Sequence, residues 1–340
     1  MAAPERYLDD NFFDHDARPS PRTWLKHLGF LLVTLVTTTI AGTLFPFGLV
    51  PTLPETDPQT WPEIFQFVTS LPARYISLVG TAIHLLFTDI TYLRYGLSFS
   101  LSLLFILISH EMGHYVACRI YKVDATLPYF IPTPPMIGPA GTFGAFIKIR
   151  SPMPSRKAVF DIGVAGPIAG FIALIPIAII GIATMEPVTA EQLAGSSGIV
   201  FSDPLLMQLF AYVRGVDLHL SMGNAFYFAG WVGLLVTALN LIPSGQLDGG
   251  HAIYAVFGET IHRWTGRIAF VLMAALSILG WFYFNSPSGF LIAVLLGVMM
   301  RIRHPEPRDR SPLGAARTAV AVLTLLIFVL CFLPFPIQIR

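Results

Sequence analysis

The sequence predicts an all-α polytopic membrane protein, and three of its features support that prediction. Hydrophobic residues make up 54% of the 340-residue chain and charged residues 12%, which is about half the charged fraction of a soluble domain. The mean hydropathy is +0.67. Several stretches are apolar for about 20 residues, the length that crosses a bilayer as a helix. The net charge of +1 gives no support to nucleic-acid binding.

We expect about six or seven transmembrane helices, from six long apolar stretches and a shorter one at 288–300. A further stretch, 75–88, is apolar for only about 14 residues, which is typical of a re-entrant or interfacial helix, so we place it outside the membrane core. Residues 285–289 resemble the tight turn of a helical hairpin. The expected spans are 28–50, 97–121, 158–184, 224–242, 266–284, 288–300 and 318–334.

The charged residues of the connecting segments predict the orientation, because Lys and Arg favour the cytoplasmic side of a membrane. Basic residues precede the first span, follow the second, and recur on that same side of the later spans. The opposite loops carry mostly Asp and Glu. We therefore expect a cytoplasmic N-terminus and alternating spans after it.

An ionisable motif lies deep within the second expected span. His110, Glu111 and His114 follow an uninterrupted apolar run, and ionisable side chains at such depth are costly unless they have a function. Residues at i and i+4 share a helix face, so His110 and His114 can bind one divalent ion. Glu111 lies about 100° round the helix, which suits a base that removes a proton from water. The motif predicts an intramembrane metal site.

A catalytic zinc ion takes three protein ligands and leaves a fourth position open, so another apolar segment should supply a third ligand. Asp248 meets this expectation because it follows the expected span 224–242. A proline and three glycines between 243 and 250 interrupt the helix there. Irregular backbone at membrane depth is tolerated only where it lines a cavity, which favours Asp248 as the ligand.

The two motifs together resemble those of the site-2 protease family of intramembrane zinc metalloproteases, peptidase family M50. That family's signatures are His-Glu-x-x-His and a later Asn-x-x-Pro-x-x-x-x-Asp-Gly, and both are complete here. The resemblance implies one Zn²⁺ per chain, held by His110, His114 and Asp248. It also implies that Glu111 is the catalytic base and that Asn240 is a polar group near the scissile bond.

The resemblance extends to 141–144 and 165–170, which are similar to the bacterial and plastid branch without a PDZ domain. It implies cleavage of membrane-protein substrates, expected to be single-span, within or near their transmembrane segments, and we expect a bacterial inner membrane. The chain then divides into a cytoplasmic N-terminal tail, a first span with its external loop, a catalytic core and accessory C-terminal spans. These parts are 1–27, 28–96, 97–258 and 259–340.

Residues 123–149 do not form a span, because five prolines would break a helix there. Their β-branched and aromatic residues favour short strands that dip into the cytoplasmic face. An exposed edge of these strands would bind an extended substrate by strand addition. A loop that merely plugs the cavity is the alternative.

Two other functions would use the same residues. A membrane metal transporter would use buried His and Asp side chains as a pathway, but it would not require a glutamate beside the first histidine. A catalytically silent scaffold with the same fold would bind membrane partners, and the intact Glu111 argues against it. We therefore favour the protease.

Overall fold

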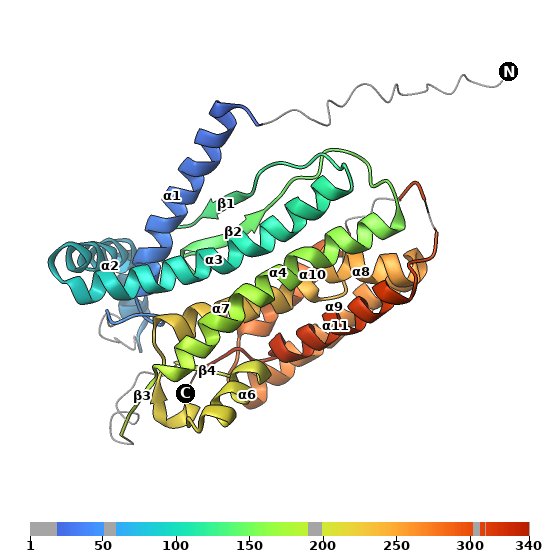
Figure 1. Ribbon diagram of the computed structural model, residues 1–340. Helices are drawn as coiled ribbons and strands as arrows, with labels where there is room; N and C mark the ends of the chain where they lie inside the picture. The colour runs from blue at the N-terminus through green and yellow to red at the C-terminus, as the bar shows by residue number, and fades with distance from the viewer. Residues whose placement is uncertain (1–18, 51–58, 190–198, 302–306, 310, 340) are drawn as a thin grey trace.

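The computed structural model describes residues 19–50, 59–189, 199–301, 307–309 and 311–339 (Figure 1). These residues form a mostly α-helical protein, as predicted; most of the tail 1–27 lies outside them. The helices are α1 (Pro21–Thr43), α2 (Trp61–Thr88), α3 (Ile90–Ile120), α4 (Arg156–Ala183), α6 (Leu205–Arg214), α7 (Ala225–Leu241), α8 (Asp248–Phe257), α9 (Glu259–Phe284), α10 (Ser288–Met299) and α11 (Ala315–Cys331).

Five of the described helices, α1, α2, α3, α4 and α9, are long and apolar enough to cross a membrane by length and composition. Helices α7, α10 and α11 are apolar but shorter. Each expected span therefore corresponds to a helix, although some boundaries differ. The sequence predicts the first span at 28–50, but α1 begins at Pro21 and ends at Thr43. The Ser20 side chain accepts the Thr23 N–H and caps the start of the helix.

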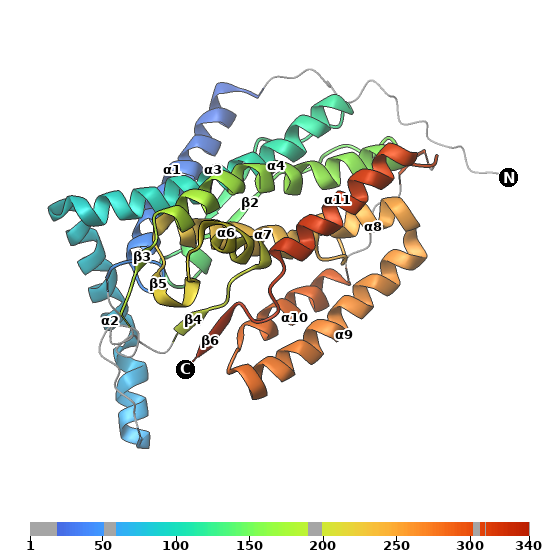
Figure 2. The same ribbon diagram turned by 60° about the horizontal axis from the view of Figure 1, so that its bottom comes forward.

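Helix α2 is longer than predicted. The expected helix over 75–88 is only its second half, because Thr60 and Glu63 form a capping box that starts the helix at Trp61. A single residue, Asp89, separates α2 from α3. Figure 2 shows α2 turning away at this junction and running across the direction of α3 and α4. The interfacial placement of α2 stays a prediction.

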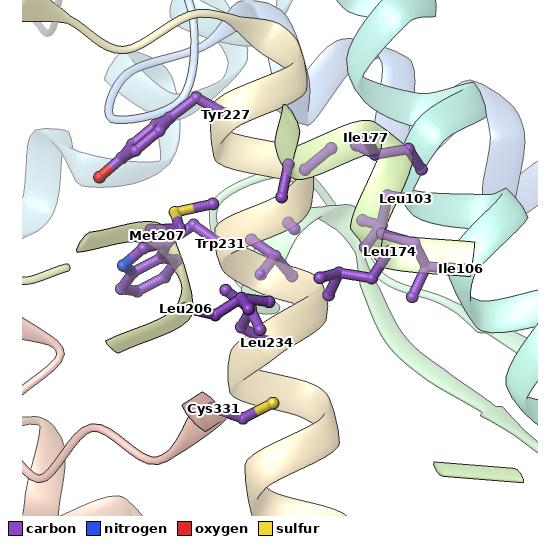
Figure 3. Packing of buried hydrophobic residues seen from close by; sticks show 14 of the residues in the cluster. Leu103, Ile106, Leu174, Ile177, Leu206, Met207, Tyr227, Trp231, Leu234 and Cys331 are labelled. Carbon is purple, nitrogen blue, oxygen red and sulfur yellow. The ribbon is translucent and has the colours of Figure 1, made fainter. Parts of the chain in front are cut away.

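The core lies around α7. Helices α3 and α4 run alongside each other and contact α7, while α1 and the strands cover the opposite side of α3 (Figure 1). Trp231 and Leu234 of α7 are fully buried among side chains from the neighbouring helices (Figure 3). Such interdigitated packing fixes the relative positions of α3, α4 and α7, on which the site depends. Other buried residues of this core include Leu103, Ile106, Leu174, Ile177, Met207 and Cys331.

Within the described residues, three small antiparallel sheets flank the helices. Strands β1 (Tyr129–Pro132) and β2 (Thr142–Phe146) pair between α3 and α4, with Phe130 opposite Ala145, and this confirms strands in the segment 123–149. Strand β3 (Glu186–Pro187) pairs with β5 (Ser221–Met222), and β4 (Ile199–Phe201) pairs with β6 (Ile337–Ile339). The short helices η2 (Pro139–Gly141) and η3 (Leu218–Leu220) lie in the connections.

The C-terminal helices pack against the core. Helices α9 and α10 form the expected hairpin, with Asn285 in the left-handed conformation at its turn. Helix α11 then returns beside α7 and α4. At its start, the Arg317 guanidinium donates to both carboxylate oxygens of Asp161 on α4, at 2.7–3.1 Å, and to the Tyr121 hydroxyl at 3.1 Å. This charged network attaches α11 to α3 and α4.

Candidate metal centre

Three side chains from two distant parts of the chain meet at one point. His110 and His114 lie one turn apart on α3, and Asp248 is the first residue of α8. The Asp248 Oδ2 atom lies 3.2 Å from His110 Nε2 and 3.3 Å from His114 Nε2. The two Nε2 atoms are 3.2 Å apart. The structure thus brings together the three residues that the motifs predicted as metal ligands.

The three ligand atoms fit a zinc ion. Bonds of about 2.0–2.1 Å from Zn²⁺ to nitrogen and oxygen place neighbouring atoms of a tetrahedron about 3.3–3.4 Å apart. The observed separations of 3.2–3.3 Å agree with that spacing. Two imidazoles and one carboxylate also leave the fourth position open, as a catalytic zinc site requires.

The His114 ring is held by α4. Its Nδ1 atom lies 2.7 Å from the carbonyl oxygen of Ile162, and an N–H donated there leaves the lone pair of Nε2 for a metal ion. In a metal-binding imidazole, a hydrogen bond from the ring nitrogen that does not bind the metal fixes the tautomer and the orientation of the ring. The backbone of α4 therefore orients the His114 side chain.

A glycine face of α4 makes room for both histidines. A Cβ atom at Gly166 would lie 2.1 Å from His114 Nε2, and one at Gly170 would lie 3.1 Å from His110 Cβ. Helix α3 also has a glycine where it meets α4, because a Cβ atom at Gly113 would lie 2.4 Å from the Ala165 carbonyl oxygen. Only glycine allows this separation of the two helices at the site.

Asp248 reaches the site because the chain breaks between α7 and α8. Gly245 has a φ of +54°, and a Cβ atom there would lie 2.5 Å from the carbonyl oxygen of Met299. Both conditions require glycine at this turn. The break turns the chain back so that the first residue of α8 faces α3.

The other end of α8 is held by Arg156, the first residue of α4. Its Nε donates to the Ala255 carbonyl and its Nη2 to the Val256 carbonyl, the latter at 2.7 Å. These carbonyls belong to the last turn of α8, where they have no partner within the helix. Arg156 thus fixes the helix that carries Asp248 to the helix that orients His114. In the sequence, Arg156 is recognisable only as one of the basic residues that follow the second expected span.

Glu111 lies next to the ligands and is 6% exposed. Its carboxylate faces the backbone N–H of Ile147, in the extended segment that continues β2. Glu111 and the three candidate ligands line a cavity of about 680 Å³, together with one wall of residues 145–153. A buried carboxylate beside a metal centre, at the wall of a cavity, is placed to move protons on a bound substrate.

Asn240 also lines this cavity, at the end of α7, and its Nδ2 atom lies 3.4 Å from His110 Nε2. Gln246 and His251, to which the two motifs assign no role, line it too. The position of His251 one turn after Asp248 on a helix was the signal that could have identified it.

Comparisons with known proteins agree with this geometry. The model of "Peptidase family M50" matches residues 98–280. The chain is 32% identical over 237 residues to "Probable zinc metalloprotease EGY1, chloroplastic" of Arabidopsis thaliana, which covers 67% of this chain and 41% of that protein. Against "Probable zinc metalloprotease EGY2, chloroplastic" of the same plant, the identity is 25% over 277 residues, or 79% of this chain and 46% of that protein. The chain thus spans less than half the length of these relatives. No solved structure matches it.

Proposed function

The chain belongs to peptidase family M50, and we propose that it is a zinc metalloprotease that hydrolyses peptide bonds within or near the transmembrane segments of membrane proteins. The observation that carries this proposal is the spacing of His110, His114 and Asp248, which fits a zinc ion beside the buried carboxylate of Glu111. We further propose that its substrates are single-span proteins and that it acts in regulated intramembrane proteolysis.

His110, His114 and Asp248 would hold the ion. When bound, Zn²⁺ supplies Lewis acidity, which makes water a nucleophile near neutral pH and polarises a carbonyl. The Glu111 carboxylate takes the proton from the attacking water and later delivers it to the leaving nitrogen of the substrate. Asn240 Nδ2 donates to the oxygen of the scissile carbonyl as negative charge develops on it.

The free edge of the strand beside Glu111 would hold the substrate. A helical peptide bond is shielded by its own hydrogen bonds, so a substrate must be extended before attack. Strand addition holds an extended peptide by its backbone. The segment that continues β2 borders the same cavity as Glu111, which supports this arrangement.

We propose the bacterial inner membrane as the location, with the N-terminus cytoplasmic, the core at 97–258 and accessory spans at 259–340. The relatives named above are chloroplastic, so membrane fractionation of the native host tests the location. Reporter fusions at residue 1 and residue 340 test the orientation, because the proposed spans place these ends on opposite sides.

The experiment compares the purified wild type with Glu111→Gln in lipid, using single-span reporter proteins and measuring bound zinc. We expect equal zinc in both and cleavage by the wild type alone. Glu259→Gln is the matched control, because its side chain is exposed and does not line the cavity. Equal cleavage by Glu111→Gln would refute Glu111 as the base, and absence of zinc from the wild type would refute the metal site.

A further inference from the structure

The strand beside Glu111 continues past β2 as an extended segment, 147–150, with one paired edge. The Lys148 N–H donates to the Thr126 hydroxyl at 2.9 Å, and the Lys148 carbonyl accepts the Thr126 N–H at 3.0 Å. The Arg150 N–H donates to the Asp124 carbonyl at 2.8 Å. Successive backbone groups of a strand alternate between its edges, so those of Ile149 point to the opposite, open edge.

That open edge faces the candidate metal centre. The Ile147 N–H lies at the Glu111 carboxylate, and residues 147–150 all line the cavity that holds the three ligands. A substrate strand added here would therefore have its scissile bond near Ile147. The substrate residues on the cytoplasmic side of that bond would lie beside Lys148 and Arg150.

The side chains of this segment present a cationic surface. Alternation along a strand puts Phe146, Lys148 and Arg150 on one face, and all three are exposed. Among the residues that the structure describes, no carboxylate forms an ion pair with Lys148 or Arg150. Their charges are therefore available to a ligand that enters the cavity.

We propose that Lys148 and Arg150 select substrates with acidic side chains about one to three residues to the cytoplasmic side of the cleaved bond. This inference rests on the proposed protease function and names the chemistry of its substrates. Lys148 lies one residue and Arg150 three residues beyond Ile147, and both are on the same face. An extended peptide paired alongside would place every second side chain beside these two cations.

An anionic lipid headgroup would satisfy the same two cations. The peptide is the better occupant because both residues line the same cavity as Glu111 and lie on the strand beside it, whereas a headgroup needs only a surface outside the cavity. The phosphate of a lipid is accordingly tested as the competing ligand.

The experiment measures kcat and KM for three reporters that differ only in the cytoplasmic flank of the cleaved bond, with Asp, Asn or Lys at the two positions. The full-length protein is used in phosphatidylcholine nanodiscs and again with phosphatidylglycerol added. We expect kcat/KM to be roughly three- to tenfold higher for Asp than for Asn, mainly through KM, and lowest for Lys. The double variant Lys148→Glu, Arg150→Glu should reverse this order, and Lys148→Gln, Arg150→Gln should abolish it. Lys122→Glu, an exposed cation outside the cavity lining, should keep it.

A second readout separates this inference from the protease function. Binding of the three reporters to Glu111→Gln is measured by co-purification, so that it requires no cleavage. Equal cleavage and equal binding of all three reporters would overturn the inference and leave the protease intact. A preference for Asp that survives the charge reversal would not come from Lys148 and Arg150, and it would overturn the inference. Loss of the preference when phosphatidylglycerol is added would assign the cations to lipid and would also overturn it.

Discussion

Gly166 lies so close to the imidazole of His114 that a Cβ atom on it would stand 2.1 Å from Nε2. The same nitrogen lies 3.3 Å from Asp248 Oδ2 and 3.2 Å from His110 Nε2, so it is the atom that would bind the metal. The bare backbone of α4 is therefore one wall of the site. Any side chain at Gly166 must displace the ligand ring or separate α3 from α4.

We predict that Gly166→Ala lowers zinc affinity at least tenfold, because the ring cannot keep its position beside the new methyl group; outer-shell changes cost about 10–100-fold in metal affinity. Zinc affinity is measured by competition with a chelator. Gly29→Ala on α1 is the matched control, since nothing lies within 4 Å of its added Cβ. It should keep full affinity, and full affinity in Gly166→Ala would contradict the prediction.

Asn240→Ala should lower kcat by about 10²-fold at unchanged zinc content, since one donor to a developing oxyanion contributes about that much. Asn224→Ala is the contrasting variant. Asn224 caps α7 through its bond to the Tyr227 N–H and donates to the Gly181 carbonyl at 2.8 Å, so its loss should lower Tm and leave kcat alone. If Asn240→Ala changed only Tm, Asn240 would be a packing residue.

Arg156→Gln should weaken zinc binding by about tenfold, because the last-turn carbonyls of α8 lose their cationic donor and Asp248 loses its fixed position. Lys157→Gln removes the neighbouring charge and tests whether charge alone matters. Arg156→Lys, which keeps the charge but not the two-pronged geometry, should recover only part of the affinity. Unchanged affinity in Arg156→Gln would show that packing alone holds α8.

Much of the site could be predicted from the sequence because it depends on the spacing of residues that are close together in the chain. The i and i+4 positions of His110 and His114 determine a shared helix face. A carboxylate that follows a broken apolar helix, as Asp248 does, predicts a metal ligand. The spans were predictable for a similar reason: the bilayer requires long apolar runs.

Contacts between distant segments were not predictable. Arg156 and Arg317 look alike in sequence as cytoplasmic charges, yet one caps α8 and the other binds Asp161. The continuous apolar run predicts a helix over 75–88 only, whereas α2 starts at Trp61 because Thr60 and Glu63 form a capping box there. A glycine in the sequence indicates only that its neighbour lies close. The structure identifies that neighbour, which for Gly166 is the His114 ring.

A double-mutant cycle on Asp161→Asn and Arg317→Gln should give a coupling energy of about 1–2 kcal/mol in the free energy of unfolding. Hydrogen bonds between charged groups contribute about 1.5–3 kcal/mol, and the side chains here are 28% and 29% exposed, which reduces that value. The cycle with Glu259 and Arg263, 3.6 Å apart and more than half exposed, should give less. Equal coupling in both cycles would contradict a structural role for the α11 contact.

Ile149→Pro tests whether the substrate pairs with the strand beside Glu111. The flanking bonds, Thr126 N–H to Lys148 and Arg150 N–H to Asp124, stay intact because the N–H of Ile149 points to the open edge. Proline is tolerated at such an edge, where it removes only an outward donor. We therefore expect an unchanged Tm and zinc content but a KM raised about tenfold, the equivalent of roughly one hydrogen bond to substrate. Ile149→Val keeps the N–H and the branched shape, so it should retain the wild-type KM. If Ile149→Pro cleaved reporters as well as Ile149→Val does, the segment would be a plug of the cavity, because a plug does not need that donor.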